Sequence, residues 1–154
     1  MSERADGQVV DACLGVRAGD VVFTSGGTEA DNLAVKGIFR ARRDEDPRRT
    51  RVLATAVEHH AVLDPVEWLG EAEGADVRWL PVDAYGRLEL AALKAELDDA
   101  PEQIALVTVM WANNEVGTVQ PVAEVAALCA AYDVPLHTDA VQAVPWIDAA
   151  AAVA

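Results

Sequence analysis

Short apolar runs alternate with longer amphipathic segments along most of the chain. The runs at residues 21–24, 52–57, 77–82, 104–110 and 136–140 have the length of β-strands. Helical spacing of apolar positions predicts helices over residues 8–16, 29–43, 89–98 and 121–132, and another from just after residue 60 to about residue 73. This alternation predicts an α/β fold with a mainly parallel sheet covered on both faces, which is a three-layer α/β/α sandwich.

A glycine-containing turn joins the first predicted strand to the next helix. It reads Ser25-Gly26-Gly27-Thr28. Glycine lets a ligand approach the main chain, and Thr28 is expected to cap a helix whose free N–H groups and positive dipole end favour phosphate. The turn matches neither of the two common nucleotide-binding glycine motifs. An ordinary capped helix start has the same residues, so the turn alone leaves both interpretations open.

Polar side chains follow four of the predicted strands. They are Ser25 to Thr28 after the first strand, His59 after the second, Asn113 to Glu115 after the fourth, and Asp139 with Gln142 at the fifth. In a sheet of this kind, ligands bind at the carboxyl ends of the strands. We therefore expect these residues to share one cleft.

The chemistry of these side chains suits one cofactor. A buried carboxylate at Asp139 needs a cation, such as a protonated heterocyclic nitrogen. His59 can stack on a ring or transfer a proton, and the amides of Asn114 and Gln142 can donate to a ring oxygen. Together with the phosphate turn, these features point to pyridoxal phosphate. Each residue also has a plain structural alternative, as a turn former, a helix cap or a surface residue.

The charge and the cysteines exclude several classes of function. The 12 basic and 26 acidic residues give a net charge of −14, which disfavours nucleic acid and anionic membranes. No apolar stretch approaches the roughly eighteen residues of a membrane span and no signal peptide is present, so a cytoplasmic protein of one domain is expected. Cys13 and Cys129 lack metal-ligand spacing, so no metal site is expected, and both are predicted to be buried. The charged run over residues 40–51 is predicted to be a solvated loop.

Four motifs carry a resemblance to a known family. They are FTSGGTE at residues 23–29, EHHAVL at 58–63, NNEVG at 113–117 and HTDAVQ at 137–142. With them the chain resembles the cysteine desulfurases, which belong to the class V aminotransferases, pyridoxal-phosphate enzymes of fold type I. The resemblance runs from the helix before residue 21 to about residue 148. It implies that residues 1–154 are part of the large domain of that fold, without the small C-terminal domain.

The resemblance also implies a role for each site residue. Gly27 and Thr28 would hold the phosphate, and Asp139 would pair with the pyridine nitrogen. His59 would stack over the ring and assist proton transfer, while Asn114 and Gln142 would address the phenolic oxygen. The implied reaction converts L-cysteine to L-alanine and passes sulfur to an enzyme persulfide for iron–sulfur cluster and thiocofactor synthesis. The implied partners are sulfur-acceptor scaffold proteins and a second copy of the chain in a homodimer.

The chain departs from this family in one important respect. The Schiff-base lysine of the family lies in a Ser-x-His-Lys motif that this sequence does not contain, and the sulfur-accepting cysteine and the substrate-binding arginine have no counterpart. Lys36 and Lys94 are the only lysines, and both fall within predicted helices. We therefore expect the chain alone to be inactive. The alternatives are a non-enzymatic remnant that binds pyridoxal phosphate or another phosphate, and another class V member such as a selenocysteine lyase or an epimerase.

Overall fold

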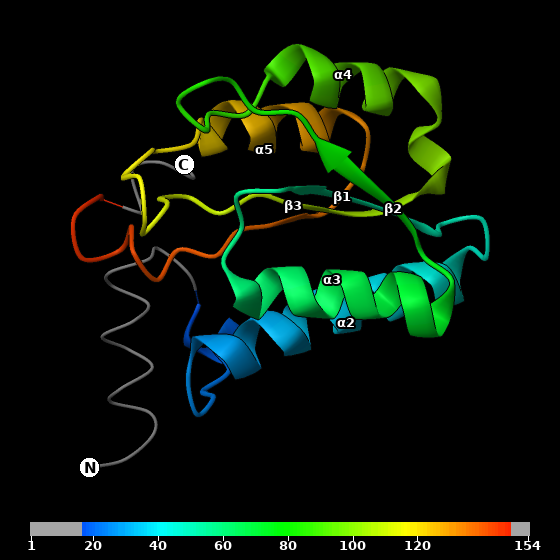
Figure 1. The fold of residues 1–154 in the computed structure, drawn as a ribbon. Helices are drawn as coiled ribbons and strands as arrows, with labels where there is room; N and C mark the ends of the chain where they lie inside the picture. The colour runs from blue at the N-terminus through cyan, green and yellow to red at the C-terminus, as the bar shows by residue number, and fades with distance from the viewer. Residues whose placement is uncertain (1–16, 149–154) are drawn as a thin grey trace.

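The computed structural model describes residues 17–148, which form a four-stranded sheet between two layers of helices (Figure 1). All strand pairs are parallel, and the strand order is β2-β1-β3-β4. The strands are β1 (Arg51–Thr55), β2 (Asp76–Leu80), β3 (Ile104–Thr108) and β4 (Leu136–His137). The helices are α2 (Gly27–Glu45), α3 (His60–Glu73), α4 (Leu90–Asp99) and α5 (Val122–Ala131), and the 3-10 turns are η1 (Ala18–Asp20) and η2 (Pro101–Gln103). The predicted three-layer α/β/α sandwich is confirmed for these residues.

The sheet separates two apolar cores because successive side chains of a strand point to opposite faces. Leu53 of β1 packs on one side with residues of α4 and α5. Its neighbours Val52 and Ala54 pack on the other side with residues of α2 and α3. β1 and β3 are buried at every position, and both are apolar except for Arg51, Thr55 and Thr108 at their ends. None of the helices in residues 17–148 is long and apolar enough to cross a membrane.

The predicted strand at residues 21–24 is absent from the described structure. Val22 is 71% exposed and Phe23 is 57% exposed, and no strand among residues 17–148 pairs with this segment. A strand needs a neighbouring backbone for its N–H and C=O groups, and the local sequence pattern cannot supply one. The prediction of a strand here was wrong for that reason. The predicted helix at residues 8–16, including Cys13, lies outside the described residues, whereas Cys129 is buried as expected.

The start of α2 also differs from the prediction. Gly26 is the N-cap residue, and Thr28 lies within the first helical turn, so Thr28 does not cap the helix. The first turn is closed instead by Glu29, whose Oε2 accepts a hydrogen bond of 2.6 Å from the N–H of Ser25. Hydrogen bonding from the side chain of Ser25, and then from its backbone N–H, lowers the pKa of Glu29. The helix thus begins two residues earlier than a threonine cap would place it, with both Gly27 and Thr28 in its first turn.

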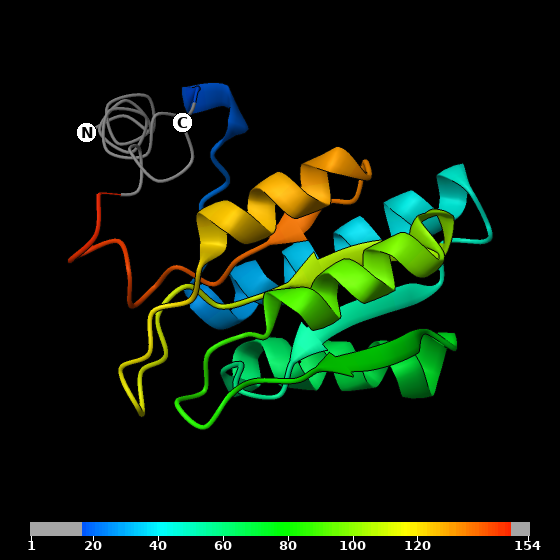
Figure 2. The same ribbon diagram turned by 90° about the horizontal axis from the view of Figure 1, so that it is seen from above.

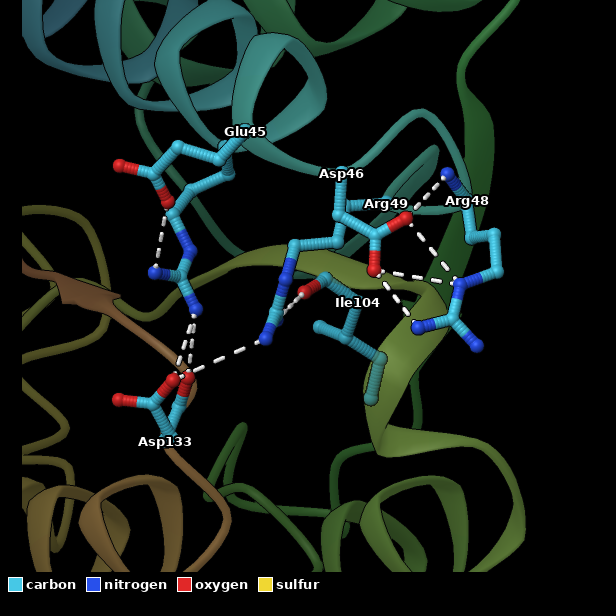
Figure 3. Close-up of polar contacts among 7 residues, drawn as sticks. Glu45, Asp46, Arg48, Arg49, Ile104 and Asp133 are labelled. Carbon is cyan, nitrogen blue, oxygen red and sulfur yellow. Dashed lines mark hydrogen bonds and ion pairs between the residues drawn. The ribbon is translucent and has the colours of Figure 1, made fainter.

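The charged run at residues 40–51 is not a simple solvated loop. α2 continues through Glu45, and arginines in its last turn and just after it connect distant parts of the chain (Figure 3). Arg42 donates to the backbone oxygen of Asp133 at 2.8 Å and to its carboxylate at 3.1 Å. Arg49 donates to the backbone oxygen of Ile104, the first residue of β3, at 2.9 Å. These contacts brace the amino ends of the strands.

Arg49 and Arg48 allow a matched test of this bracing. Arg49→Met removes the donor to Ile104 from a side chain that is 14% exposed, so we expect the free energy of unfolding to fall by about 1–2 kcal/mol. Arg48 pairs with Asp46 on the surface, and its side chain is 68% exposed. Arg48→Met should therefore leave the urea midpoint unchanged. Equal midpoints for the two variants would contradict a bracing role for Arg49.

Candidate functional site

The six residues predicted to form the site line one pocket at the carboxyl end of the sheet. They are Gly27, Thr28, His59, Asn114, Asp139 and Gln142. The pocket measures about 170 Å³. Figure 2 shows why they meet: the yellow segment near residue 115 and the orange-red segment after β4 lie at the same end of the sheet as the blue start of α2. The geometric expectation of a shared cleft is met, while the individual roles of these residues stay predictions.

The start of α2 forms one wall of the pocket. The first helical hydrogen bond runs from the N–H of Ala30 to the oxygen of Gly26, so the N–H groups of the three residues between them have no acceptor within the helix. A Cβ atom added at Gly27 would lie 3.3 Å from Cγ2 of Val141, so the absence of a side chain lets the segment after β4 approach closely. This wall offers backbone donors suited to an anion.

His59 lies directly before α3 and lines the pocket. It is the N-cap residue of α3, and its Nδ1 accepts a hydrogen bond of 3.1 Å from the N–H of Ala61. Because Nδ1 acts as acceptor, this geometry assigns the ring proton to Nε2 in the neutral form. The structural and chemical interpretations of His59 are therefore compatible, since the helix cap uses Nδ1 and not Nε2.

Asn113 and Asn114 have different roles. Asn113 forms the turn: its Oδ1 accepts from the N–H groups of Glu115 and Val116 at 2.8 Å, and its Nδ2 donates to the oxygen of Val57 at 2.9 Å. Asn114 is the member of the pair that lines the pocket. The surface-turn alternative thus applies to Asn113 and leaves the amide of Asn114 available for a ligand.

Asp139 is half-buried, whereas the sequence analysis placed a buried carboxylate at this position. The reason is that β4 ends at His137, so Asp139 lies two residues beyond the strand. Its Oδ1 accepts a hydrogen bond of 3.0 Å from the N–H of Val141, which makes it a turn former as well as a pocket residue. Gln142 follows on the same turn and is exposed.

Glu58, for which the sequence predicts no role, is 6% exposed and lies beside the pocket residues. Its Oε1 accepts hydrogen bonds from Thr55 Oγ1 at 2.6 Å and from the N–H of Met110 at 2.8 Å. Its Oε2 is buried without a partner among the described residues. Burial raises the pKa of Glu58 to about 7, against the lowering effect of these two hydrogen bonds and of His137. Only its place between a strand and His59 was visible in the sequence.

Asp31 and His137 were also missed. Asp31 is 5% exposed and lines the pocket, one helical turn after Gly27. Its Oδ1 lies 3.4 Å from Nε2 of His137. The spacing of four residues between Gly27 and Asp31 was the available signal, because it places both on one helix face. The local sequence does not predict that His137 lies opposite this helix face.

The two lysines lie away from the pocket. Lys36 places its Nζ 4.2 Å from the ring centre of Trp68, and Lys94 forms an ion pair of 2.6 Å with Asp98. Their predicted location on helices is confirmed. Among residues 17–148, no group of three or more histidine, cysteine or acidic side chains is arranged to hold a metal ion.

The buried carboxyl of Glu58 predicts a specific dependence of stability on pH. Its pKa rises from 4.5 to about 7 on folding, so the folded chain keeps the proton that the unfolded chain loses in this interval. Stability from this group is therefore fully present below pH 4.5 and is lost as the pH rises through 7. In Glu58→Gln this loss, about 3 kcal/mol, should disappear.

Urea unfolding from pH 4.5 to 7.5 measures this difference. Glu67→Gln, at an exposed glutamate of α3, is the control and should follow the wild-type curve. Parallel curves for the wild type and Glu58→Gln would show that Glu58 does not keep its proton in the folded chain.

Comparison with known proteins identifies the family of the chain. The model of the class-V aminotransferase family matches residues 5–151. An IscS-like cysteine desulfurase of Mycobacterium tuberculosis is 56% identical over 131 residues, which are 85% of this chain and 33% of that protein. A putative cysteine desulfurase of Bacillus subtilis, IscS 1, is 46% identical over 134 residues, 87% of this chain and 34% of that protein.

Solved structures show the same fold. The crystal structure of DndA from Streptomyces lividans matches with a TM-score of 0.82 and 33% identity, over 92% of this chain and 38% of that one. The arrangement is that of the fold type I pyridoxal-phosphate enzymes. The chain spans about a third of the length of the curated relatives that it matches. The family model covers nearly all of its length, and the chain therefore belongs to the class-V aminotransferase family, whose members depend on pyridoxal phosphate.

Proposed function

We propose that this chain forms the cofactor-holding part of the large domain of a cysteine desulfurase. The reaction takes L-cysteine and an enzyme thiol to L-alanine and an enzyme persulfide, so the sulfur leaves the substrate carbon and joins the thiol. The convergence of Gly27, Thr28, His59, Asn114, Asp139 and Gln142 on one pocket carries the proposal. The 56% identity with a relative named as a cysteine desulfurase supports the choice of reaction.

The pocket residues fit pyridoxal phosphate. The free N–H groups at the start of α2, with Gly27 and Thr28, would hold its phosphate, and the Asp139 carboxylate would keep a proton on its ring nitrogen. Asn114 and Gln142 would donate hydrogen bonds to its phenolic oxygen. When bound, the cofactor supplies an electron sink for the substrate carbon.

His59 would cover the ring and move a proton at its Nε2. Nδ1 is occupied by the N–H of Ala61, so Nε2 is the nitrogen left for acid–base work. The hydrogen bond at Nδ1 also fixes the plane of the imidazole, because Nδ1 is held by the helix start.

The partners follow from the same proposal. L-cysteine is the substrate, sulfur-acceptor scaffold proteins receive the sulfur, and the full-length protein acts as a cytoplasmic homodimer. The net charge of −14 argues against nucleic acid and anionic membranes as partners. Selenocysteine lyase chemistry would use the same cofactor contacts, so substrate choice is decided by turnover assays and not by this pocket.

The position of the lysines supports a second candidate for the chain by itself. Neither Lys36 nor Lys94 lines the pocket, and each has a partner of its own elsewhere. A pocket without a lysine can bind the cofactor phosphate and ring but cannot anchor the cofactor covalently. We therefore propose that the 154-residue chain alone binds pyridoxal phosphate without turnover.

Binding is the first test of this proposal. Equilibrium dialysis should show reversible binding of pyridoxal phosphate to the chain, and Asp139→Ala should weaken it by about tenfold because the ring nitrogen loses its charged partner. Asp44→Ala is the matched control, since Asp44 is an exposed carboxylate of α2 away from the pocket. Equal affinities for the two variants would contradict the assignment of Asp139.

Turnover is the second test. The chain with pyridoxal phosphate should release no sulfide from L-cysteine above the free-cofactor background, and borohydride should fix no cofactor on Lys36 or Lys94. A chimera that joins residues 1–148 to the C-terminal portion of the Mycobacterium tuberculosis relative should release sulfide. Sulfide from the chain alone would overturn the proposal of binding without turnover, and a folded chimera that binds the cofactor but acts only on another amino acid would overturn the desulfurase assignment.

A further inference from the structure

The start of α2 is poorly anchored to the sheet by apolar packing. Val35 and Phe39, further along the helix, are fully buried against the sheet. Towards the helix start, α2 and the segment after β4 approach closely at Gly27 and Val141, and an open groove of about 330 Å³ lies beside this contact. Ala30 and Ala34 line this groove, and their short side chains do not fill it. A polar contact across the groove therefore has to add to the contact at Gly27 if the helix start is to be held firmly.

The imidazole of His137 bridges this groove. His137 lies at the end of β4, opposite Thr108 of β3, and its side chain is 10% exposed. Its Nδ1 lies 2.8 Å from Oγ1 of Thr108, and its Nε2 lies 3.4 Å from Oδ1 of Asp31. One tautomer serves both contacts, with the threonine hydroxyl donating to Nδ1 and the Nε2 proton directed to the Asp31 carboxylate.

The same strand end fixes the position of Asp139. The N–H of Val109 donates to the oxygen of His137 at 3.1 Å, and the N–H of Trp111 donates to the oxygen of Asp139 at 2.9 Å. These bonds tie the segment that carries both residues to the continuation of β3. Asp31 lies one helical turn from Gly27, so its contact with His137 links the helix start to that tied segment.

The geometry points to Asp31 and His137 as positioning residues that set the distance between the start of α2 and Asp139. This inference rests on the proposed function, in which the helix start holds the phosphate and Asp139 holds the ring nitrogen of the same molecule. A ligand that must satisfy both anchors at once is sensitive to their separation. A ligand that contacts only the helix start is not sensitive to the separation of the two anchors. This difference separates a positioning role from a general effect on folding.

The test compares a two-point ligand with a one-point ligand in the full 154-residue chain. His137→Phe keeps an aromatic ring but removes both nitrogens, and Asp31→Ala removes the carboxylate. Each should weaken binding of pyridoxal phosphate by about tenfold and change binding of inorganic phosphate by less than about twofold. Asp31→Asn keeps an oxygen acceptor and is the conservative control, with pyridoxal-phosphate affinity within about twofold of the wild type.

The double variant Asp31→Ala/His137→Phe should bind pyridoxal phosphate no more weakly than either single variant, because each removes the same contact. Circular dichroism identifies any variant that fails to fold. If His137→Phe does not fold, the comparison of pyridoxal-phosphate affinity between Asp31→Ala and Asp31→Asn is sufficient. Equal loss for both ligands, or unchanged affinity for pyridoxal phosphate in Asp31→Ala, would overturn the positioning role while leaving the proposed function intact. A wild-type chain that does not bind pyridoxal phosphate would overturn both.

Discussion

Parallel pairing of β1 with β3 is the constraint on which the rest of the structure depends. Because both strands are buried on both faces, helices must cover the sheet on each side, and each connection must return the chain to the same end of the sheet. All strands therefore begin at one edge and end at the other. The chemistry of the chain is divided between these edges, with structural arginines at the amino ends and the pocket at the carboxyl ends.

At the carboxyl edge of the sheet, side chains bond the backbone groups that lie beyond the strand pairing. Glu58 accepts from the N–H of Met110 just beyond β3, and Asn113 donates to the oxygen of Val57 just beyond β1. His59 in turn accepts from the first N–H groups of α3. Buried or terminal backbone groups need such partners. The residues around the pocket thus hold the strand ends in place, and the same bonds fix the directions of the side chains that remain free.

The electrostatics of the pocket come from dipoles and carboxyl groups. Among residues 17–148, ten line the pocket, and these include two aspartates and no lysine or arginine. An anion there would depend on the free N–H groups and the positive end of α2, and a cation would be favoured beside Asp139. Burial raises the pKa of Glu58 to about 7, so below that pH its neutral carboxyl adds no negative charge to this region. Such a separation of anion-binding and cation-binding ends suits a ligand that carries both.

The sequence alone determined the elements and the edge at which the polar residues gather. Apolar periodicity is a local property, so α2, α3, α4 and β3 could be predicted within a few residues, and the parallel topology that follows places strand ends together. The tertiary structure decided what depends on partners far along the chain. Residues 21–24 have a strand-like sequence but pair with no strand among the described residues. Arg49 contacts the backbone of Ile104. Asp31 contacts His137 across an open groove. The burial of Glu58 is of the same kind, since pKa values and pairing are set by surroundings that only folding assembles.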